Sequence, residues 1–94
     1  MATLLSDASA DGAGSGASHT APATVHLHAD SVLDGARIEI EAATTDTAAE
    51  YANTGVYFDH RNRKPQNCDI QGTYYLRAVV RDANNSTSLT VETT

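Results

Sequence analysis

Residues 72–82, Gly-Thr-Tyr-Tyr-Leu-Arg-Ala-Val-Val-Arg-Asp, restrict the fold more than any other part of the sequence. Read with a period of two, one face is apolar and the other carries Arg77 and Arg81. Alternation among β-branched and aromatic residues is typical of a half-buried strand. Residues 87–92 alternate again, after a polar segment, Ala83-Asn84-Asn85-Ser86, of the kind that favours turns. The sequence therefore predicts a β-hairpin over 72–92.

Two earlier segments, 23–30 and 36–43, alternate in the same way, and Asp34-Gly35 between them is a hairpin-turn signal. Their predicted inward residues are Val25, Leu27, Ala29, Ala36, Ile38, Ile40 and Ala42. Further along we expect one helical turn within Thr47–Tyr51, a short strand over Val56–Phe58 started by Gly55, and a polar loop over 59–68. Five or six short strands with turn signals between them predict an all-β fold, a small antiparallel β-sandwich. A jelly roll or a small β-barrel is the alternative.

The 94 residues predict one small domain with an appended segment. Residues 1–22 are rich in Ala, Ser, Gly and Thr, so we expect a flexible N-terminal arm, followed by the β-sandwich domain at 23–94. Gly12, Gly14 and Gly16 read as linker residues. Leu4 and Leu5 are the apolar exceptions, and we expect them to bind a partner when the arm pairs with a neighbouring sheet edge.

The predicted core is thin, because the chain has no Trp, one Phe and an apolar fraction of 40%. Small domains of this kind often add disulfides, but the single cysteine, Cys68, cannot form one within the chain. We interpret Cys68 as a buried, unreactive thiol. Burial against partner chains is then the favoured source of extra stability, which predicts a homo-oligomer.

The net charge of −6 is unevenly distributed, with a balance of −8 over residues 1–59 and +2 over residues 60–94. Half of the positive charge lies in one loop, at Arg61, Arg63 and Lys64, and we expect these residues to dock onto an acidic protein partner. An acidic chain is a poor candidate for nucleic-acid binding. The N-terminus lacks the features of a signal peptide, and no apolar segment is long enough to cross a bilayer, so we expect assembly in the cytoplasm and no membrane partner.

One arrangement of residues is compatible with a metal site. His26 and His28 share the outward face of one predicted strand, and Glu39 and Glu41 share that of the next, so imidazole and carboxylate groups would converge if the strands formed a hairpin. The alternative is a solvated face with cross-strand charge pairs that involve the two arginines of 72–82. We favour the charged face, and we expect no metal, no cofactor and no catalytic residues. The chain is predicted not to be an enzyme.

Local sequence around residue 74 resembles the start of the sixth strand of immunoglobulin-like domains. The resemblance is carried by Asp69, Gly72, Tyr74 and Leu76, and it implies an Ig-like sandwich. Tyr74 would be the corner tyrosine of that fold, and Leu76 occupies the place of its second disulfide cysteine.

A broader resemblance covers about residues 20–44 and 72–93. The Gly/Ala/Ser-rich start, APATVHL, LDGARIEIEA and GTYYLRAVVRDANNSTSLTVET resemble small virion-structural proteins of tailed bacteriophages, some of which decorate or cement the capsid as β-sandwich oligomers. The resemblance implies a capsid decoration protein on the virion surface, assembled in the host cytoplasm and bound to the major capsid protein and to copies of itself. The alternative is a carbohydrate- or host-surface-binding Ig-like module of a phage tail or fibre, which would use exposed Tyr51, Tyr57 and Tyr75.

Overall fold

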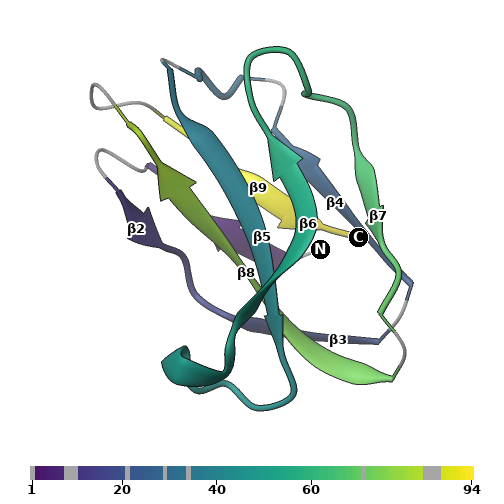
Figure 1. The fold of residues 1–94 in the computed structure, drawn as a ribbon. Coiled ribbons are helices and arrows are strands. Elements are labelled where there is room, and N and C mark those ends of the chain that lie inside the picture. The colour runs from purple at the N-terminus through teal and green to yellow at the C-terminus, as the bar shows by residue number, and fades with distance from the viewer. Residues whose placement is uncertain are drawn as a thin grey trace.

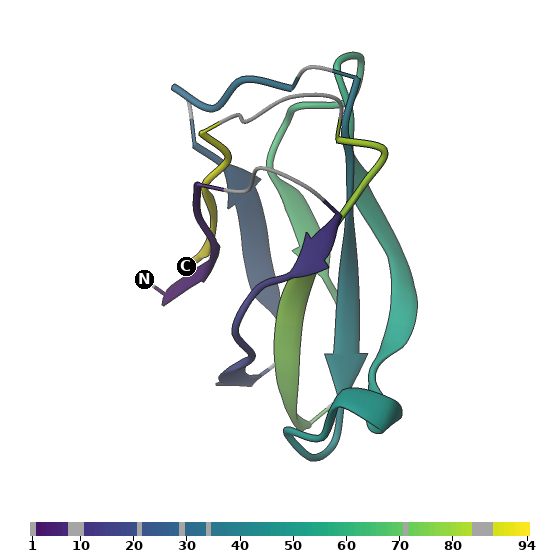
Figure 2. The ribbon, with the colours of Figure 1, turned by 90° about the vertical axis from the view of Figure 1, so that its left-hand side faces the viewer.

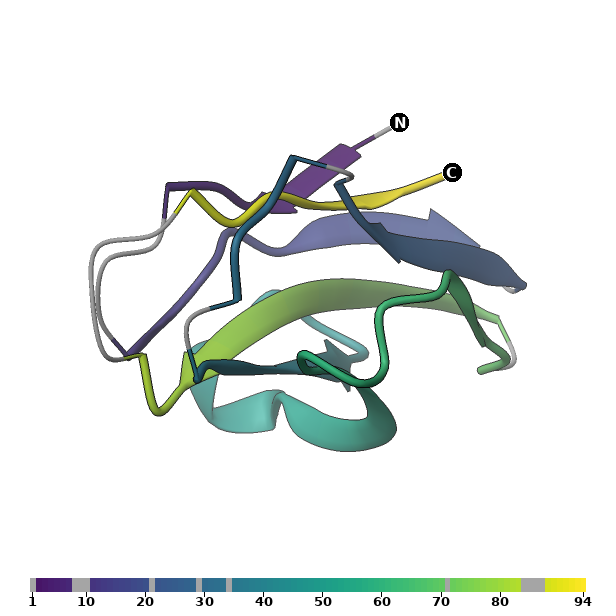
Figure 3. The same ribbon diagram turned by 90° about the horizontal axis from the view of Figure 1, so that it is seen from above.

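The computed structural model describes residues 2–7, 11–20, 22–28, 30–33, 35–70, 72–83 and 88–94. Two antiparallel sheets pack face to face (Figure 1), and Figure 3 shows them from above as separate layers. The predicted all-β sandwich is confirmed. The one helical element in the described ranges is the 3-10 turn Ala48–Glu50, inside the predicted turn, and no helix there is long and apolar enough to span a membrane.

The first sheet, called the β4 sheet, has the strand order β1 (Ala2–Leu5), β9 (Val91–Thr93), β4 (Ala23–Leu27) and β7 (Gln66–Cys68). The second, called the β8 sheet, is built on β8 (Thr73–Arg81). On one edge β8 pairs with β2 (Gly12–Ala13) and β3 (Ala17–Thr20), and on the other with β5 (Arg37–Ala43), which pairs with β6 (Ala52–Phe58).

The core lies between the sheets and is formed by the alternating inward side chains. The predicted inward residues of β4, β5 and β8 are buried except Ala42, which packs against the core and is partly exposed, as are Val56 and Ile70. Ala29 lies outside the described residues. The largest fully buried apolar side chains are Phe58, Leu4, Ile38, Ile40, Leu76, Leu89, Val25, Val80 and Val91.

The predicted hairpin over 72–92 is wrong, because β8 and β9 belong to different sheets. The strand that follows β8 in the chain therefore lies in the β4 sheet, on the opposite side of the core. Residues 88–90 then run beside the segment after β4: Val32 N–H donates to the carbonyl of Ser88 at 3.2 Å, and His28 N–H donates to the carbonyl of Thr90 at 2.7 Å. The residues 84–87 of the predicted turn lie outside the described part of the chain. Alternation predicts which face of a strand is buried, and both arrangements bury the same face.

The second predicted hairpin fails for the same reason. β4 and β5, on either side of the Asp34-Gly35 signal, pack across the core from one another and share no hydrogen-bonded pairs. Asp34 is not described, and Gly35 has a φ of +74°, a conformation that glycine adopts readily. The true hairpin of this region joins β5 to β6 through residues 44–51.

Part of the predicted polar loop over 59–68 is a strand. β7 pairs with β4 at the edge of its sheet, with Cys68 opposite Ala23 and Gln66 opposite Val25. An edge strand of three residues needs only one inward apolar side chain, and Cys68 supplies it at 2% exposure. Burial raises the pKa of the Cys68 thiol, which agrees with its interpretation as unreactive.

The N-terminal segment is built into the sandwich in this structure, where the sequence predicts a separate flexible arm. β1 pairs with β9, and β2 and β3 pair with β8, so the first of these strands extends the β4 sheet and the other two extend the β8 sheet (Figure 2). Leu4 anchors β1 in the core at 1% exposure. Gly14 and Gly16 are close-approach positions instead of linker residues, since a Cβ would overlap the Leu4 carbonyl at the first and the Tyr51 hydroxyl at the second.

Tyr74 forms the corner contact that its resemblance to Ig-like domains implies. Its hydroxyl donates to the carbonyl of Cys68 at 3.4 Å, from the start of β8 to the end of β7. Counting β4 as the second strand, the pairs β4·β7 and β5·β8 are those of an immunoglobulin domain. The outer strands are exchanged, because β9 lies beside β4 and β3 lies beside β8. The sandwich thus has an Ig-like centre with different terminal strands.

Candidate functional site

The outer face of the β8 sheet carries cross-strand ion pairs. Glu41 on β5 lies opposite Arg77 on β8, with 2.7 Å between carboxylate oxygen and guanidinium nitrogen. Glu39 accepts from Arg81 at 3.0 Å and lies 3.6 Å from Arg37. The charged-face interpretation of these glutamates is therefore confirmed. Each carboxylate already has a cationic partner on its own surface.

Two tyrosines of this face are covered by the same arginines. The Arg37 guanidinium lies 4.1 Å from the ring centroid of Tyr57, and that of Arg77 lies 4.2 Å from the ring centroid of Tyr51. The Tyr51 hydroxyl also donates to Asp46 at 2.6 Å. Burial, reinforced by this hydrogen bond, raises the pKa of Tyr51 to about 12. Two of the three tyrosines on which glycan stacking would depend are thus engaged within the chain.

His26 of β4 and His28, which follows that strand, lie away from these glutamates. β4 belongs to the other sheet, where His26 is paired with Glu92 of β9. His28 is exposed, with Nδ1 3.9 Å from a carboxylate oxygen of Asp30. The convergence of His26 and His28 with Glu39 and Glu41 therefore does not occur. Throughout the described ranges, no group of three or more His, Cys, Asp or Glu side chains is placed to hold a metal ion.

The segment of residues 59–65, called the cationic loop, is held by its own polar side chains. Asp59 Oδ1 accepts from the backbone N–H of Arg61 at 2.9 Å and of Asn62 at 2.8 Å, and these bonds lower the pKa of the Asp59 carboxyl. The Asn62 side chain donates to the Tyr57 carbonyl at 2.9 Å. The turn after β6 is thus fixed by local hydrogen bonds.

The three cations of the loop have different environments. Arg63 donates to the carbonyl of Ser31 at 2.7 Å and so ties the loop to the segment after β4. Arg61 and Lys64 are exposed, and no ion pair joins them to an acidic side chain in the part of the chain that the structure describes. The sequence singled out all three as docking residues, whereas the geometry leaves Arg61 and Lys64 available and engages Arg63 internally.

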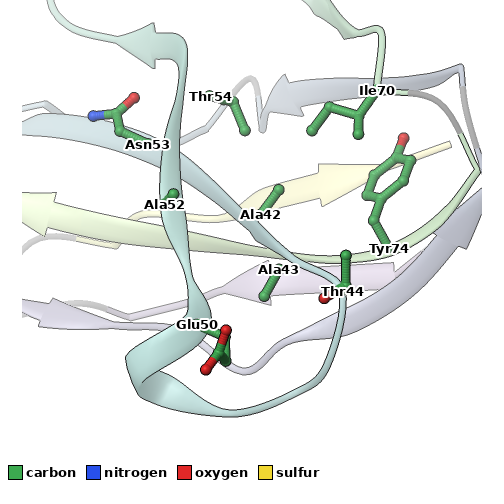
Figure 4. Close-up of a pocket in the computed structure, with 9 residues that line it drawn as sticks. All are labelled: Ala42, Ala43, Thr44, Glu50, Ala52, Asn53, Thr54, Ile70 and Tyr74. Atoms are coloured by element: carbon green, nitrogen blue, oxygen red, sulfur yellow. The ribbon is translucent and has the colours of Figure 1, made fainter.

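A pocket of about 430 Å³ opens at the opposite end of β6 (Figure 4). Most of the lining surface is apolar, and Glu50 contributes the one carboxylate among the lining residues. The lining residues are Ala42, Ala43, Thr44, Glu50, Ala52, Asn53, Thr54, Ile70 and Tyr74.

Sequence reasoning missed this pocket, although Gly55 gave a signal for it. Between the pairs Glu39↔Tyr57 and Glu41↔Asn53 the register shifts, so β6 bulges beside the pocket. Gly55 sits in the bulge with a φ of +87°. A glycine inside a strand pattern is a recognised sign of a bulge.

The two leucines proposed to bind a partner lie within the sandwich. Leu4 is buried in the core, and Leu5 is partly buried against it. Both stabilise β1 on the rest of the chain, so in this structure Leu4 has no exposed surface to offer a partner.

No protein family model, curated protein or solved structure matches this chain.

Proposed function

We propose that the chain is a non-enzymatic structural protein that binds an acidic protein surface through its cationic loop. In its specific form, the proposal is a decoration protein of a tailed-phage head. It would bind the major capsid protein and copies of itself on the virion surface, after assembly in the host cytoplasm. No cofactor and no catalytic step is part of the proposal.

The observation that carries the proposal is the difference between the cations of the loop and those of the sheet. Arg37, Arg77 and Arg81 are paired with glutamates, while Arg61 and Lys64 project from a turn fixed by Asp59 and Asn62. Exposed charges on a preformed loop give electrostatic complementarity with little loss of conformational entropy on binding. The resemblance to phage structural proteins supplies the identity of the acidic surface.

Glycan binding, the alternative function, has less support. Sugar rings stack on open aromatic faces, and Arg37 and Arg77 already lie over Tyr57 and Tyr51. Tyr75 remains, and one partly buried aromatic side chain is a small platform.

Gradient-purified particles of the phage that encodes the chain provide the test. Mass spectrometry should detect the chain in amounts comparable to the major capsid protein, and recombinant chain should co-sediment with particles that lack it. Arg61→Glu with Lys64→Glu should lower occupancy most at low salt, where the reversed attraction is least screened. Absence of the chain from purified particles would overturn the phage assignment.

A variant of Arg63 separates the stability of the loop from its binding to a partner. Arg63→Gln removes the hydrogen bond to the Ser31 carbonyl, so it should loosen the loop and lower the melting temperature. The double variant Arg61→Glu, Lys64→Glu should leave melting unchanged, because neither side chain has a described partner in the fold. A double variant that binds as well as the original at low salt would assign the loop to solvation alone.

A further inference from the structure

We propose that the pocket at the start of β6 receives the cationic loop of a second copy, so that copies of this chain associate head to tail. The inference rests on the proposed function, in which the cationic loop binds an acidic protein surface, and it identifies a second copy of this chain as one such partner. It adds the site on that partner, which is lined by Glu50 and the alanines of β5 and β6.

The pocket and the loop lie at opposite ends of one strand. Ala52, Asn53 and Thr54 at the start of β6 line the pocket, and the loop begins at Asp59, directly after the strand ends at Phe58. Seven extended residues span roughly 20 Å. The loop therefore cannot enter the pocket of its own chain, whereas two copies placed end to end would bring the loop of one to the pocket of the other.

The chemistry of the pocket suits a long cationic side chain. Its lining includes the short apolar side chains of Ala42, Ala43 and Ala52, and Figure 4 shows the Glu50 carboxylate set apart from the larger side chains Ile70 and Tyr74. Lys64 combines a four-carbon apolar stem with a terminal ammonium group, so the stem can lie on the alanines while the ammonium meets the carboxylate. Glu50 is exposed and has no described cationic partner in its own chain.

The local charges of the two regions are complementary. The described connections at the pocket end, residues 44–50, 69–70 and 72, contain Asp46, Glu50 and Asp69 and neither Lys nor Arg. The cationic loop contains three cations and one acid. Two cationic loops would repel each other, and so would two acidic pocket ends, which favours contact between the loop of one copy and the pocket end of the next.

A contact between two different surfaces of the same protein is heterologous, so it closes into a ring or extends as a filament. Exposed pairs of this kind are individually weak. We therefore expect association in free solution to be weak and salt-dependent, and to strengthen when many copies are held on one particle.

Reciprocal charge reversal tests the contact. Sedimentation velocity of the full chain at low salt should show an average mass that rises with concentration and falls when salt is added. Glu50→Lys alone or Lys64→Glu alone should weaken self-association about tenfold, because each opposes like charges at the contact. An equimolar mixture of the two variants should associate again, since each loop then finds a pocket of opposite charge.

Asp69→Lys is the matched control, because it makes the same charge change at the same end of the molecule without touching the pocket lining. It should weaken self-association less than Glu50→Lys does, because Asp69 adds to the acidic charge of the pocket end but does not line the pocket, and thermal melting should show that all three variants are folded. A wild-type chain that is monomeric at every concentration, or a mixture that stays monomeric, would overturn the inference. So would equal weakening by Asp69→Lys and Glu50→Lys.

These outcomes are distinguishable from failure of the proposed function. A monomeric chain that still needs Arg61 and Lys64 to bind phage particles would overturn only the self-association. A chain that associates through Glu50 and Lys64 but is absent from purified particles would overturn only the phage assignment.

Discussion

Arg77 and Glu41 face each other across β8 and β5, with 2.7 Å between Nη2 of the arginine and Oε1 of the glutamate. The two side chains are only 19% and 12% exposed. Arg37 and Glu39 form a looser pair on the same face, at 3.6 Å and with the arginine 47% exposed. The strength of an ion pair depends on geometry and on shielding from water, so the two pairs should differ in energy.

Double-mutant cycles should separate these two pairs. Arg77→Met with Glu41→Gln should give a coupling energy of about 1 kcal/mol, and Arg37→Met with Glu39→Gln should give about 0.3 kcal/mol. Urea unfolding of each single and double variant supplies the four free energies of each cycle. Equal coupling in the two cycles would show that burial does not strengthen the Arg77–Glu41 pair.

The hydroxyl of Tyr74 should contribute to stability. Tyr74→Phe keeps the buried ring and leaves the Cys68 carbonyl without this donor, which should cost about 1 kcal/mol in free energy of unfolding. Tyr75→Phe is the matched control, because Tyr75 lies on the outer face and its hydroxyl has no described hydrogen bond. If both variants unfold at the same urea concentration as the original chain, the corner contact is energetically neutral.

The crowded glycines should differ in their tolerance of a methyl group. At Gly14 the obstacle is the carbonyl of Leu4, and the Gly14 N–H is bonded to the Ala78 carbonyl at 2.7 Å, so the backbone is held on both sides. Gly14→Ala should cost about 3 kcal/mol. At Gly16 the obstacles are the ends of two side chains, Tyr51 and Asp46, which can rotate away.

Gly16→Ala should therefore cost about 1 kcal/mol, roughly the loss of the hydrogen bond between those side chains. Thermal and urea unfolding of both variants supply the comparison. A Gly14→Ala variant as stable as the original chain would contradict the close contact between β1 and the segment joining β2 to β3.

His19 should make stability depend on pH. Its ring lies 3.2 Å from the hydroxyl of Thr93, which is buried, and burial lowers the pKa of His19 below 6.5. The unfolded chain then takes up the proton first as pH falls. The contribution of His19 is therefore complete above its unfolded pKa and is lost as the pH falls from 6.5 towards its folded pKa.

The variant His19→Gln keeps a polar group and does not titrate. Between about pH 7 and about pH 5 the original chain should lose more stability than this variant, and above that range their stability curves should run parallel. Urea midpoints measured across the range give the comparison. Parallel curves throughout would mean that His19 has the same pKa in the folded and unfolded chains.

Period-two patterning predicted β4, β5 and β8 and their buried faces, but it did not predict which sheet each strand joins. Val25 and Leu27 point inward from β4, and Ile38 and Ile40 point inward from β5, whether the strands pair directly or face each other across the core. The Asp34-Gly35 signal predicts a change of direction, and both arrangements require one. Sheet membership is decided by contacts distant in sequence, such as β4 with β7 and β9.

The composition of the N-terminal segment did not predict its strands. Ala, Ser and Gly suggest a flexible segment, but short side chains also allow β2 and β3 to lie along β8 with little steric demand. The sequence marks Leu4 as an apolar exception and predicts that it binds another chain, whereas Leu4 is buried in the core of its own chain. In the candidate site, the sequence predicted the cationic loop. It did not predict the hydrogen bond from Arg63 to the Ser31 carbonyl, because the two residues are 32 positions apart in the chain.

The pairing of β1 with β9 has a mechanical consequence. The strands are antiparallel and Ala2 lies opposite Thr93, so the two ends of the described chain lie together at one end of the pair. Tension applied between these ends would load the β1–β9 hydrogen bonds one after another, and such peeling needs less force than shearing all of them at once. A pull applied to the sides of the sandwich, away from the two ends, would therefore strain this domain less than the same pull applied between its ends.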